Sequence, residues 1–355
     1  PHTPRDAPEP ELRGIFACRR RLHPADPQAT ASTMEDRREE SMIDVEHRPP
    51  RVRRVTTTRA RWLAAAGVAV LLVIAGGWIP GIVGTAVAAA LPWLGLVLLA
   101  LLIAALFLAR RVVVVILVPA LLWILAMAPA LPALPGPTGS ESASASGLTV
   151  VSQNVRARSG GAAASATELA QSGADVIALV ELDGDSLSAA QNALAGQYPH
   201  SYTVGTVGVW SRYPLANAEP LTLGLSWKRA LRVEVQVPST PVAVYVMHAA
   251  SVRPGHQQDR DTMLSGLADQ VGSDPADSLI AVGDFNAPST DPSLTALRAE
   301  ADWVRPTDGS LGLTWPVAFP LVRIDQVFVR GLDVVTSGTI RAGNSDHLAT
   351  LTRVR

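Results

Sequence analysis

Residues that suit phosphate and metal chemistry follow several apolar segments in the second half of the chain. The clearest case is SLIAVGDFNAPST, residues 278–290, where Asp284 and Asn286 follow an apolar run. Residues two apart in extended chain point the same way, so both side chains are expected to face one site where the strand ends. A loop acid and amide can also simply bond their own backbone, which is their common structural role.

Similar polar residues stand at the ends of other predicted strands. They are Asn154, Glu181 and His248 at strand ends, Asp325 at a strand start, and Asp346 and His347 before the last strand. Ligand-binding groups collect at the strand ends of α/β sheets. Each residue alone has an ordinary structural explanation, such as a hydrogen-bonded histidine or a surface ion pair between Arg323 and Asp325. Their joint occurrence in this order favours a common site.

The ordered motifs QNV, VELD, WSRYP, MHA, GDFNAP, TWP followed by RID, and SDH resemble those of the endonuclease/exonuclease/phosphatase superfamily, which includes deoxyribonuclease I. The resemblance covers residues 148–355 and implies an α/β sandwich of two sheets that hydrolyses phosphoric esters with a divalent metal. Two departures stand out. MHAA replaces a usual Thr-His-Leu run, and Gln326 follows RID where an aromatic residue is common.

The resemblance also implies a metal site. Glu181 corresponds to the family's metal carboxylate, Asp346 to its companion on the metal or its water shell, and Asn154 to a contact of the metal-bound phosphate. Oxygen ligands of this kind suit a hard divalent cation, so the expected cofactor is Mg²⁺ or Mn²⁺.

The catalytic roles follow from the same correspondence. Asp284 is expected to position or activate the attacking water, and Asn286 to bind a phosphate oxygen. His347 pairs with Asp325, whose carboxylate would orient the imidazole and stabilise its cation. His248 is expected on the leaving-group side as a donor or electrostatic stabiliser.

Three long apolar segments precede this domain. The chain of 355 residues has a mean hydropathy of +0.23, and no charged side chain occurs at positions 62–109. The segments span residues 62–79, 82–109 and 112–130, each sufficient to cross a bilayer as a helix. Buried helices of a soluble domain would carry more polar positions, and a cleaved signal peptide would explain only the first segment. We therefore expect a three-helix membrane anchor over residues 59–131.

Basic residues set the expected orientation. Arg51, Arg53, Arg54, Arg59 and Arg61 precede the first segment, and Arg110 and Arg111 separate the second from the third. Positively charged flanks remain cytoplasmic, so the protein is expected to be a multi-pass cell-membrane protein with its catalytic domain outside the cytoplasm. Residues 1–58 form the expected disordered, basic cytoplasmic tail, and residues 132–147 a Pro/Gly/Ser linker. The sole cysteine, Cys18, excludes an intramolecular disulfide.

The domain over residues 148–355 has short apolar runs typical of strands and amphipathic stretches typical of helices. Strands are expected at residues 148–154, 175–181, 208–211, 232–237, 242–249, 278–284, 325–329 and 348–354. Helices are expected at residues 165–173, 186–196 and 256–271. The histidines His200 and His256 are expected to be structural or solvent-facing.

Charge and tethering favour a lipid substrate. The domain has about 15 basic and about 20 acidic residues, so it lacks the basic footprint of a nucleic-acid-binding protein. Tethering favours substrates in the membrane, such as a phospholipid or a polyprenyl phosphate. The architecture also resembles actinobacterial membrane proteins associated with teicoplanin resistance.

Other functional classes are weaker. A surface-anchored nuclease acting on DNA is the alternative enzyme, and a small phosphoester is the alternative to a phosphorylated lipid as substrate. An inactive binding module would lack a key residue, and a transporter would carry ionisable residues within its spans. The oligomeric state is left open.

Overall fold

The structure is a computed structural model, and it describes residues 52–132, 147–253, 255 and 257–355. Cys18, His256 and all but the ends of the predicted tail and linker lie outside these residues. Helix α2 (Val52–Gly76) begins inside the segment assigned to the tail.

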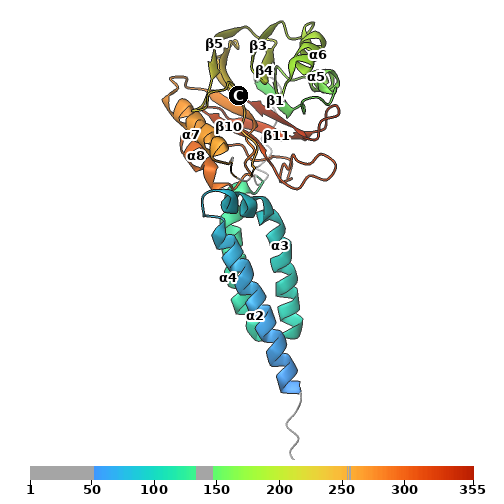
Figure 1. Ribbon diagram of the computed structural model, residues 1–355, viewed down its shortest axis with the longest axis vertical. Coiled ribbons are helices and arrows are strands. Elements are labelled where there is room, and N and C mark those ends of the chain that lie inside the picture. The colour runs from blue at the N-terminus through green and yellow to red at the C-terminus, as the bar shows by residue number, and fades with distance from the viewer. Residues whose placement is uncertain (1–51, 133–146, 254, 256) are drawn as a thin grey trace, which may run out of the picture. The chain divides into compact units, whose positions relative to one another are not determined.

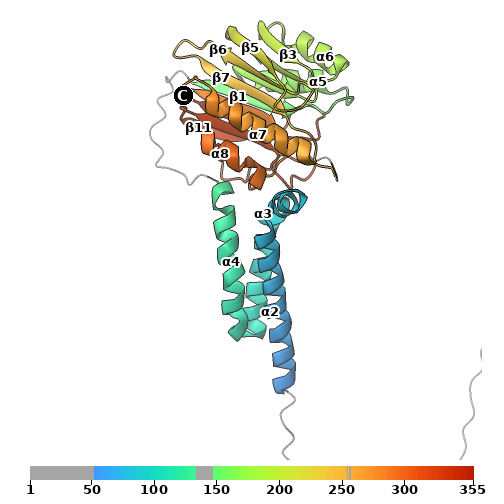
Figure 2. The ribbon, with the colours of Figure 1, turned by 60° about the vertical axis from the view of Figure 1, so that its left-hand side comes forward.

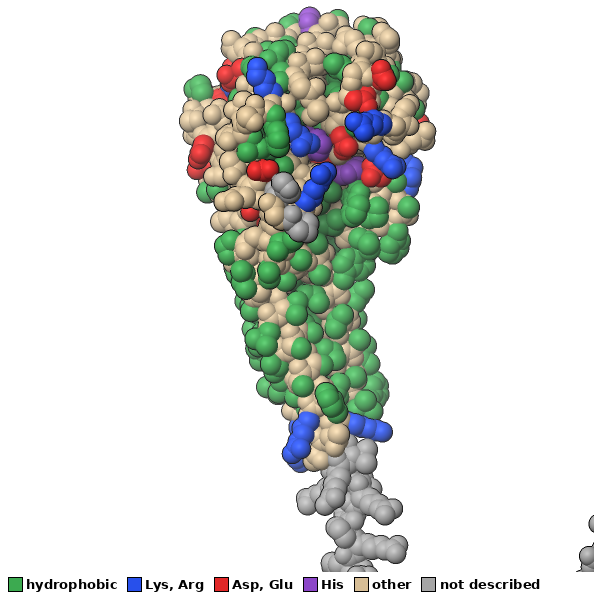
Figure 3. All heavy atoms as spheres, in the orientation of Figure 1, with side chains coloured by type: hydrophobic (Ala, Val, Ile, Leu, Met, Phe, Trp, Pro, Cys, Tyr) green, Lys and Arg blue, Asp and Glu red, His purple; other side chains and the backbone are tan. Residues whose placement is uncertain are grey.

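Three apolar helical segments precede the α/β domain. They comprise α2, α3 (Ile82–Leu108), and a run formed by η2 (Arg110–Val112), α4 (Val113–Met127) and η3 (Ala128–Ala130). The stretches Thr57–Gly76, Ile82–Leu108 and Arg110–Ala130 are 20, 27 and 21 residues long and apolar enough to cross a membrane. Hydrophobic side chains cover the visible face of these helices (Figure 3). An exposed surface of this kind suits lipid rather than water.

Two six-stranded sheets form the α/β domain (Figures 1 and 2). In spatial order, the first sheet contains β11 (Val334–Ile340), β12 (Ala349–Val354), β1 (Leu148–Asn154), β2 (Val176–Val180), β4 (Val207–Ser211) and β3 (His200–Val204). The second contains β5 (Leu215–Leu221), β6 (Ala230–Val235), β7 (Val242–His248), β8 (Leu279–Asp284), β10 (Asp325–Arg330) and β9 (Asp302–Trp303). Only the pairs β1–β2 and β7–β8 are parallel among the described strands.

A valine-rich core lies between the sheets. It includes Val150 and Val176 of the first sheet and Val244 and Val282 of the second. Branched side chains of this type pack well on a pleated surface. This core aligns the two sheets so that the ends of their central strands meet.

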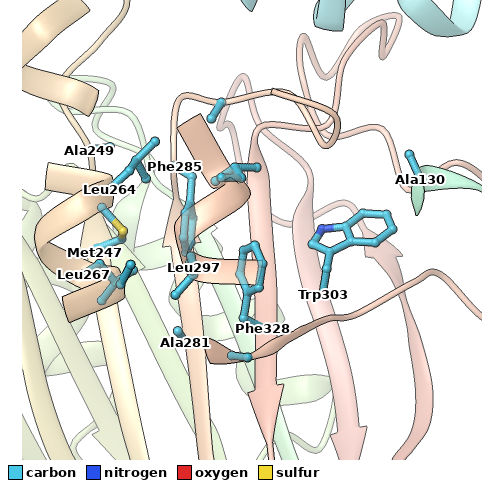
Figure 4. Packing of buried hydrophobic residues seen from close by; sticks show 14 of the residues in the cluster. Ala130, Met247, Ala249, Leu264, Leu267, Ala281, Phe285, Leu297, Trp303 and Phe328 are labelled. Carbon is cyan, nitrogen blue, oxygen red and sulfur yellow. The ribbon is translucent and has the colours of Figure 1, made fainter. Parts of the chain in front are cut away.

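Helices cover the outer faces of both sheets. Helices α5 (Ala162–Gln171) and α6 (Gly184–Leu194) contribute to a core cluster with the first sheet. Helices α7 (Gln257–Ser273) and α8 (Thr295–Glu300) pack with the second sheet. Figure 4 shows Phe285, Leu297 and Phe328 in this packing, and the rings of Phe285 and Phe328 lie 5.6 Å apart. The short η4 (Pro292–Leu294) joins the end of β8 to α8.

The predicted fold class, a two-sheet α/β sandwich after three apolar helices, is confirmed. All eight expected strands and three expected helices occur, with shifted ends. The strands β3, β5, β9 and β11 and helix α8 were not predicted. Strand β5 has mostly exposed or half-buried residues, so it lacks the apolar alternation that marks a strand in a sequence.

Candidate active site

Strand register brings three predicted residues into one row across the second sheet. Asp284, the last residue of β8, lies opposite His248 of parallel β7 and opposite Asp325 of antiparallel β10. All three side chains are buried. Asp325 therefore joins the site at the beginning of its strand because β10 runs against its neighbour.

The first sheet supplies Asn154 to the same place. Asn154 Nδ2 donates a hydrogen bond to Asp284 Oδ2 over 3.0 Å, and both side chains are buried. Asn154 is opposite Val180 in the parallel pair β1–β2, so Glu181 follows at the same edge of the sheet. The two sheets thus meet at a polar cluster formed by their strand ends.

The loop after β8 differs from the extended chain that we expected. Asn286 has a φ of 48°, so the chain has already turned at this residue. Asp284 Oδ1 accepts the backbone N–H of Asn286 over 2.9 Å, while Asn286 Nδ2 donates to the carbonyl of Ala249 over 3.0 Å. The loop-capping interpretation is therefore correct for one carboxylate oxygen. The other oxygen accepts from Asn154 and, over 3.4 Å, from the side chain of Asn286. The two side chains thus meet at one place as expected, although the backbone between them is not extended.

Two buried side chains stabilise this loop by hydrogen bonds to its backbone carbonyls. Arg260 Nη1 donates to the carbonyl of Asn286 over 3.1 Å, and Gln326 Nε2 donates to that of Ala287 over 2.8 Å. Gln326 also accepts the indole N–H of Trp303. The glutamine that departs from the family pattern therefore braces the segment that carries Asn286.

His347 and Asp325 form a buried pair. His347 Nδ1 lies 2.9 Å from Asp325 Oδ2. Burial alone would lower the pKa of His347, but Asp325 outweighs it, with help from Asp284 and Asp346, and raises that pKa to about 9. Ser345 accepts the backbone N–H of His347 and donates to the carbonyl of Asn154, which holds this loop against β1. The pair can present a cationic imidazole to a phosphate.

The surroundings of Asp284 disfavour the charged form of its side chain, whereas those of His347 favour it. Burial, followed by the nearby charge of Asp325, raises the pKa of Asp284 to about 7. Ligand atoms of Asp284, Asp325 and His347 lie within 4.8 Å of one another and could together hold a cation. Because His347 already bonds Asp325 and Asp284 already accepts from Asn154, we read this group as acid–base machinery.

Glu181 and Asp346, the predicted metal carboxylates, are half-buried beside that machinery. Glu181 has a φ of 63°, a conformation that is uncommon for a residue with a side chain and that is typical of functional positions. In the described part of the chain, neither carboxylate forms a hydrogen bond or an ion pair. Free carboxylate oxygens of this kind fit a hydrated divalent cation. The amide of Asn154, in contrast, already donates to Asp284 and accepts the backbone N–H of Arg156.

Arg229 is a site residue that sequence reasoning missed. Its Nη2 lies 2.9 Å from His248 Nε2, and its carbonyl accepts the N–H of His248. Burial lowers the pKa of Arg229, while the charges of Asp284 and Glu181 raise it. Arg229 enters the site because β6 pairs with β7, which puts the residue before β6 next to the end of β7. Only a prediction of this strand pairing could have identified it.

His248 is consequently a neutral imidazole. Burial, then the charges of Arg229 and His347, lower its pKa well below the ordinary value. Of the two roles expected for His248, a hydrogen-bonding role fits this environment better than that of a cation. Arg229 supplies the positive charge on this side of the site.

Arg323 of the RID motif lies in the core. Its guanidinium stacks over the ring of Trp303 at 4.7 Å, and Nε donates to the carbonyl of Asp325. The alternative of a surface ion pair with Asp325 was wrong, because both side chains are buried.

Figure 3 shows histidine side chains beside acidic and basic ones on the visible face of the domain.

Solved structures share this fold. A humanized D. rerio TDP2 carrying 14 mutations is 19% identical, with a TM-score of 0.52 and coverage of 59% of this chain and 100% of that chain. D. rerio TDP2 complexed with a single strand DNA product is 19% identical, with a TM-score of 0.50 and the same coverage. Truncated Caenorhabditis elegans TDP2 is 16% identical, with a TM-score of 0.50 and coverage of 59% and 97%.

The match to a family model identifies the family of the chain. No curated protein matches the chain by sequence. The model of the Endonuclease/Exonuclease/phosphatase family matches residues 151–347, from the middle of β1 to the histidine of the buried pair. The chain therefore belongs to the endonuclease/exonuclease/phosphatase family.

Proposed function

We propose that the protein is a divalent-metal-dependent phosphoric ester hydrolase anchored in the cell membrane. The carrying observation is the buried cluster at the joined sheet ends, in which Asn154 bonds Asp284 and His347 bonds Asp325. Such a cluster keeps a proton acceptor and a cationic donor close together in a site of low dielectric, where their effect on a phosphate is large.

Glu181 and Asp346 would hold Mg²⁺ or Mn²⁺, with Asn154 beside the metal-bound phosphate. A cation bound there would neutralise phosphate charge and act as a Lewis acid. The support is the pair of half-buried carboxylates that lack protein partners in the described residues, and the left-handed backbone of Glu181.

The remaining residues act on the attacking water, the phosphate oxygens and the leaving group. Asp284 takes a proton from the attacking water, a task suited to a carboxyl group whose pKa burial and Asp325 raise to about 7. Asn286 and the His347 cation bind phosphate oxygens. His248 donates a hydrogen bond on the leaving-group side, and Arg229 contributes positive charge there.

The proposed substrate is a lipid-linked phosphate or diphosphate, and the proposed location of the catalytic domain is outside the cytoplasm. Three apolar spans support the membrane part of this proposal, and the arginines that flank the first and second spans support the orientation. A tethered site gains effective concentration toward substrates in its own membrane.

A surface-anchored nuclease is the second candidate. The observation that favours it is the likeness of the fold to D. rerio TDP2, whose structure contains a single strand DNA product. The acidic balance of the domain opposes it, since strong phosphate-backbone binding requires clustered basic residues.

Release of inorganic phosphate from a polyprenyl diphosphate in detergent tests the proposal. Full-length protein with Mg²⁺ is compared with Asp284→Ala, His347→Ala and the control Asp302→Ala, which changes an exposed acid. Release that stops with EDTA and in the first two variants only would support the lipid phosphatase. Plasmid nicking without phosphate release would establish the nuclease. The absence of both activities would favour a binding module.

A further inference from the structure

A cavity of about 240 Å³ lies between the helical anchor and the loop that follows β8. One wall comes from the ends of the three apolar helices and includes Trp78, Leu91 and Leu125. The opposite wall comes from the α/β domain and includes Asp291, Thr295 and Arg298. None of the proposed catalytic or metal-binding residues lines this cavity.

The helix wall opens toward the lipid-facing surface. Trp78 is 57% exposed and Leu125 is 62% exposed, whereas Leu91 is buried on the inner side. In a bilayer, hydrocarbon surrounds exposed apolar helix faces of this kind. A hydrocarbon chain can therefore reach the cavity from the membrane without crossing water.

The domain wall carries one arginine, Arg298, that forms no ion pair among the described residues. Asp291 is paired with Arg260, whose Nη1 lies 3.0 Å from it and which also pairs with the half-buried Asp261. Arg298 instead stacks over the rings of Trp303 at 5.1 Å and Phe328 at 6.0 Å. It donates to the carbonyl of Ser289 and forms no ion pair with any described carboxylate.

Arg298 remains a cation in this setting. Burial, followed by the charge of Arg305, lowers its pKa to about 10, which is still far above neutral pH. A half-buried guanidinium with free donors binds phosphate oxygens well. The cavity thus combines an apolar wall open to lipid with a single site for an anionic group.

We propose that this cavity binds one anionic phospholipid of the surrounding bilayer, with its hydrocarbon chain against Leu91 and Leu125 and its phosphate at Arg298. Since the cavity contains no residue of the catalytic cluster, the lipid is a resident ligand and not a substrate. This inference rests on the membrane anchor of the proposed function but not on its hydrolase activity.

Native mass spectrometry of the full chain in detergent tests this proposal. Phosphatidylglycerol is the anionic probe and phosphatidylcholine the neutral one. The wild-type protein is expected to retain one phosphatidylglycerol at a detergent concentration that strips phosphatidylcholine. Arg298→Gln should weaken this retention by about tenfold, the usual scale of a lost charge-assisted bond. The control Arg341→Gln, which alters an exposed arginine outside the cavity, should leave it unchanged.

A second variant tests the helix wall in case Arg298→Gln disturbs the domain. Leu91→Trp would fill the cavity from the buried side and should reduce retention of phosphatidylglycerol without removing any charge. Equal retention of both lipids by the wild-type protein would overturn the proposal. So would retention that neither variant changes, or equally strong displacement of phosphatidylglycerol by a polyprenyl diphosphate.

Discussion

Asn154 of the first sheet and Asp284 of the second are joined by a hydrogen bond of 3.0 Å between two buried side chains. This bond crosses the interface between the sheets at the place where β1 and β8 both end. Buried polar groups are costly unless they are paired, so the sheets must meet in this register for the site to form. The packing of the sandwich and the assembly of the active site are consequently one event.

Gly283→Ala is expected to disrupt the site by disturbing this register. Gly283 has a φ of 137°, and an added Cβ would collide with the carbonyl oxygen of Met247 on the neighbouring strand. A strained backbone of this kind costs roughly 1–3 kcal/mol, and the clash adds to it. Thermal unfolding should show a lower midpoint, and phosphate release should fall in parallel. The control Gly184→Ala meets no atom within 4 Å and should leave both unchanged. A fully active Gly283→Ala protein would contradict the required close approach of β7 and β8.

Glu181→Gln is expected to weaken metal binding more than folding. The amide keeps the size of the side chain but loses the charge that a hard cation prefers. The Mg²⁺ concentration for half-maximal phosphate release should rise by at least about tenfold. Metal titration of the activity measures this change, and Glu300→Gln, an exposed acid on α8, is the control. An unchanged metal requirement would exclude Glu181 as a ligand and would favour a metal site that includes Asp284 and Asp325.

Most of the site was readable from the sequence because its residues lie at the ends of strongly apolar strands. Asn154, His248 and Asp284 end β1, β7 and β8, which are buried along most of their length. The local sequence pattern is sufficient to predict that such residues lie at strand ends. Arg229 was missed because its position depends on the pairing of β6 with β7, and pairing between strands is not a local property.

The edges of the sheets were less predictable for a related reason. Strands β5 and β11 are at sheet edges and contain many exposed or half-buried residues, so their sequences resemble loops. A loop was expected after β8, but the left-handed backbone at Asn286 was missed, because Arg260 and Gln326 stabilise this loop from distant segments. Tertiary contacts therefore decided the features that local patterns left undefined.

Thr85→Val is expected to reduce activity although Thr85 lies in an apolar helix. Thr85 Oγ1 accepts hydrogen bonds from Arg260 Nη2 over 3.0 Å and from Gln257 Nε2 over 3.2 Å. Arg260 is fully buried and also holds the carbonyl of Asn286, so a lost acceptor affects the catalytic loop. Leaving buried donors unpaired costs roughly 1–3 kcal/mol of stability. Phosphate release should fall several-fold, and thermal unfolding should occur earlier.

The reverse exchange on the same helix is the control for Thr85. Val83→Thr changes an exposed residue of α3 and should leave both activity and unfolding unchanged. If Thr85→Val matched the wild-type protein in both measurements, the contact between the anchor and Arg260 would have no role in supporting Asn286.

Asp274→Asn is expected to remove a pH-dependent contribution to the free energy of unfolding. Asp274 pairs with Arg232, whose Nε lies 2.6 Å from Oδ2, and it also accepts from the hydroxyl of Tyr245. Burial opposes the charged form, but these hydrogen bonds outweigh it and lower the pKa of Asp274 to about 2. Because the folded pKa is below the unfolded value of 3.8, the contribution is complete above that value and is lost as pH falls toward 2.

Unfolding midpoints across pH separate this effect from a simple loss of packing. The wild-type protein should exceed Asp274→Asn in stability by on the order of 1–2 kcal/mol at pH 7, and the difference should shrink between about pH 4 and pH 2. Asp269→Asn changes an exposed acid of helix α7, which ends just before Asp274, and should show no such trend. A difference for Asp274→Asn that stayed constant across this range would mean that the carboxylate stabilises the fold by its shape and not by its charge.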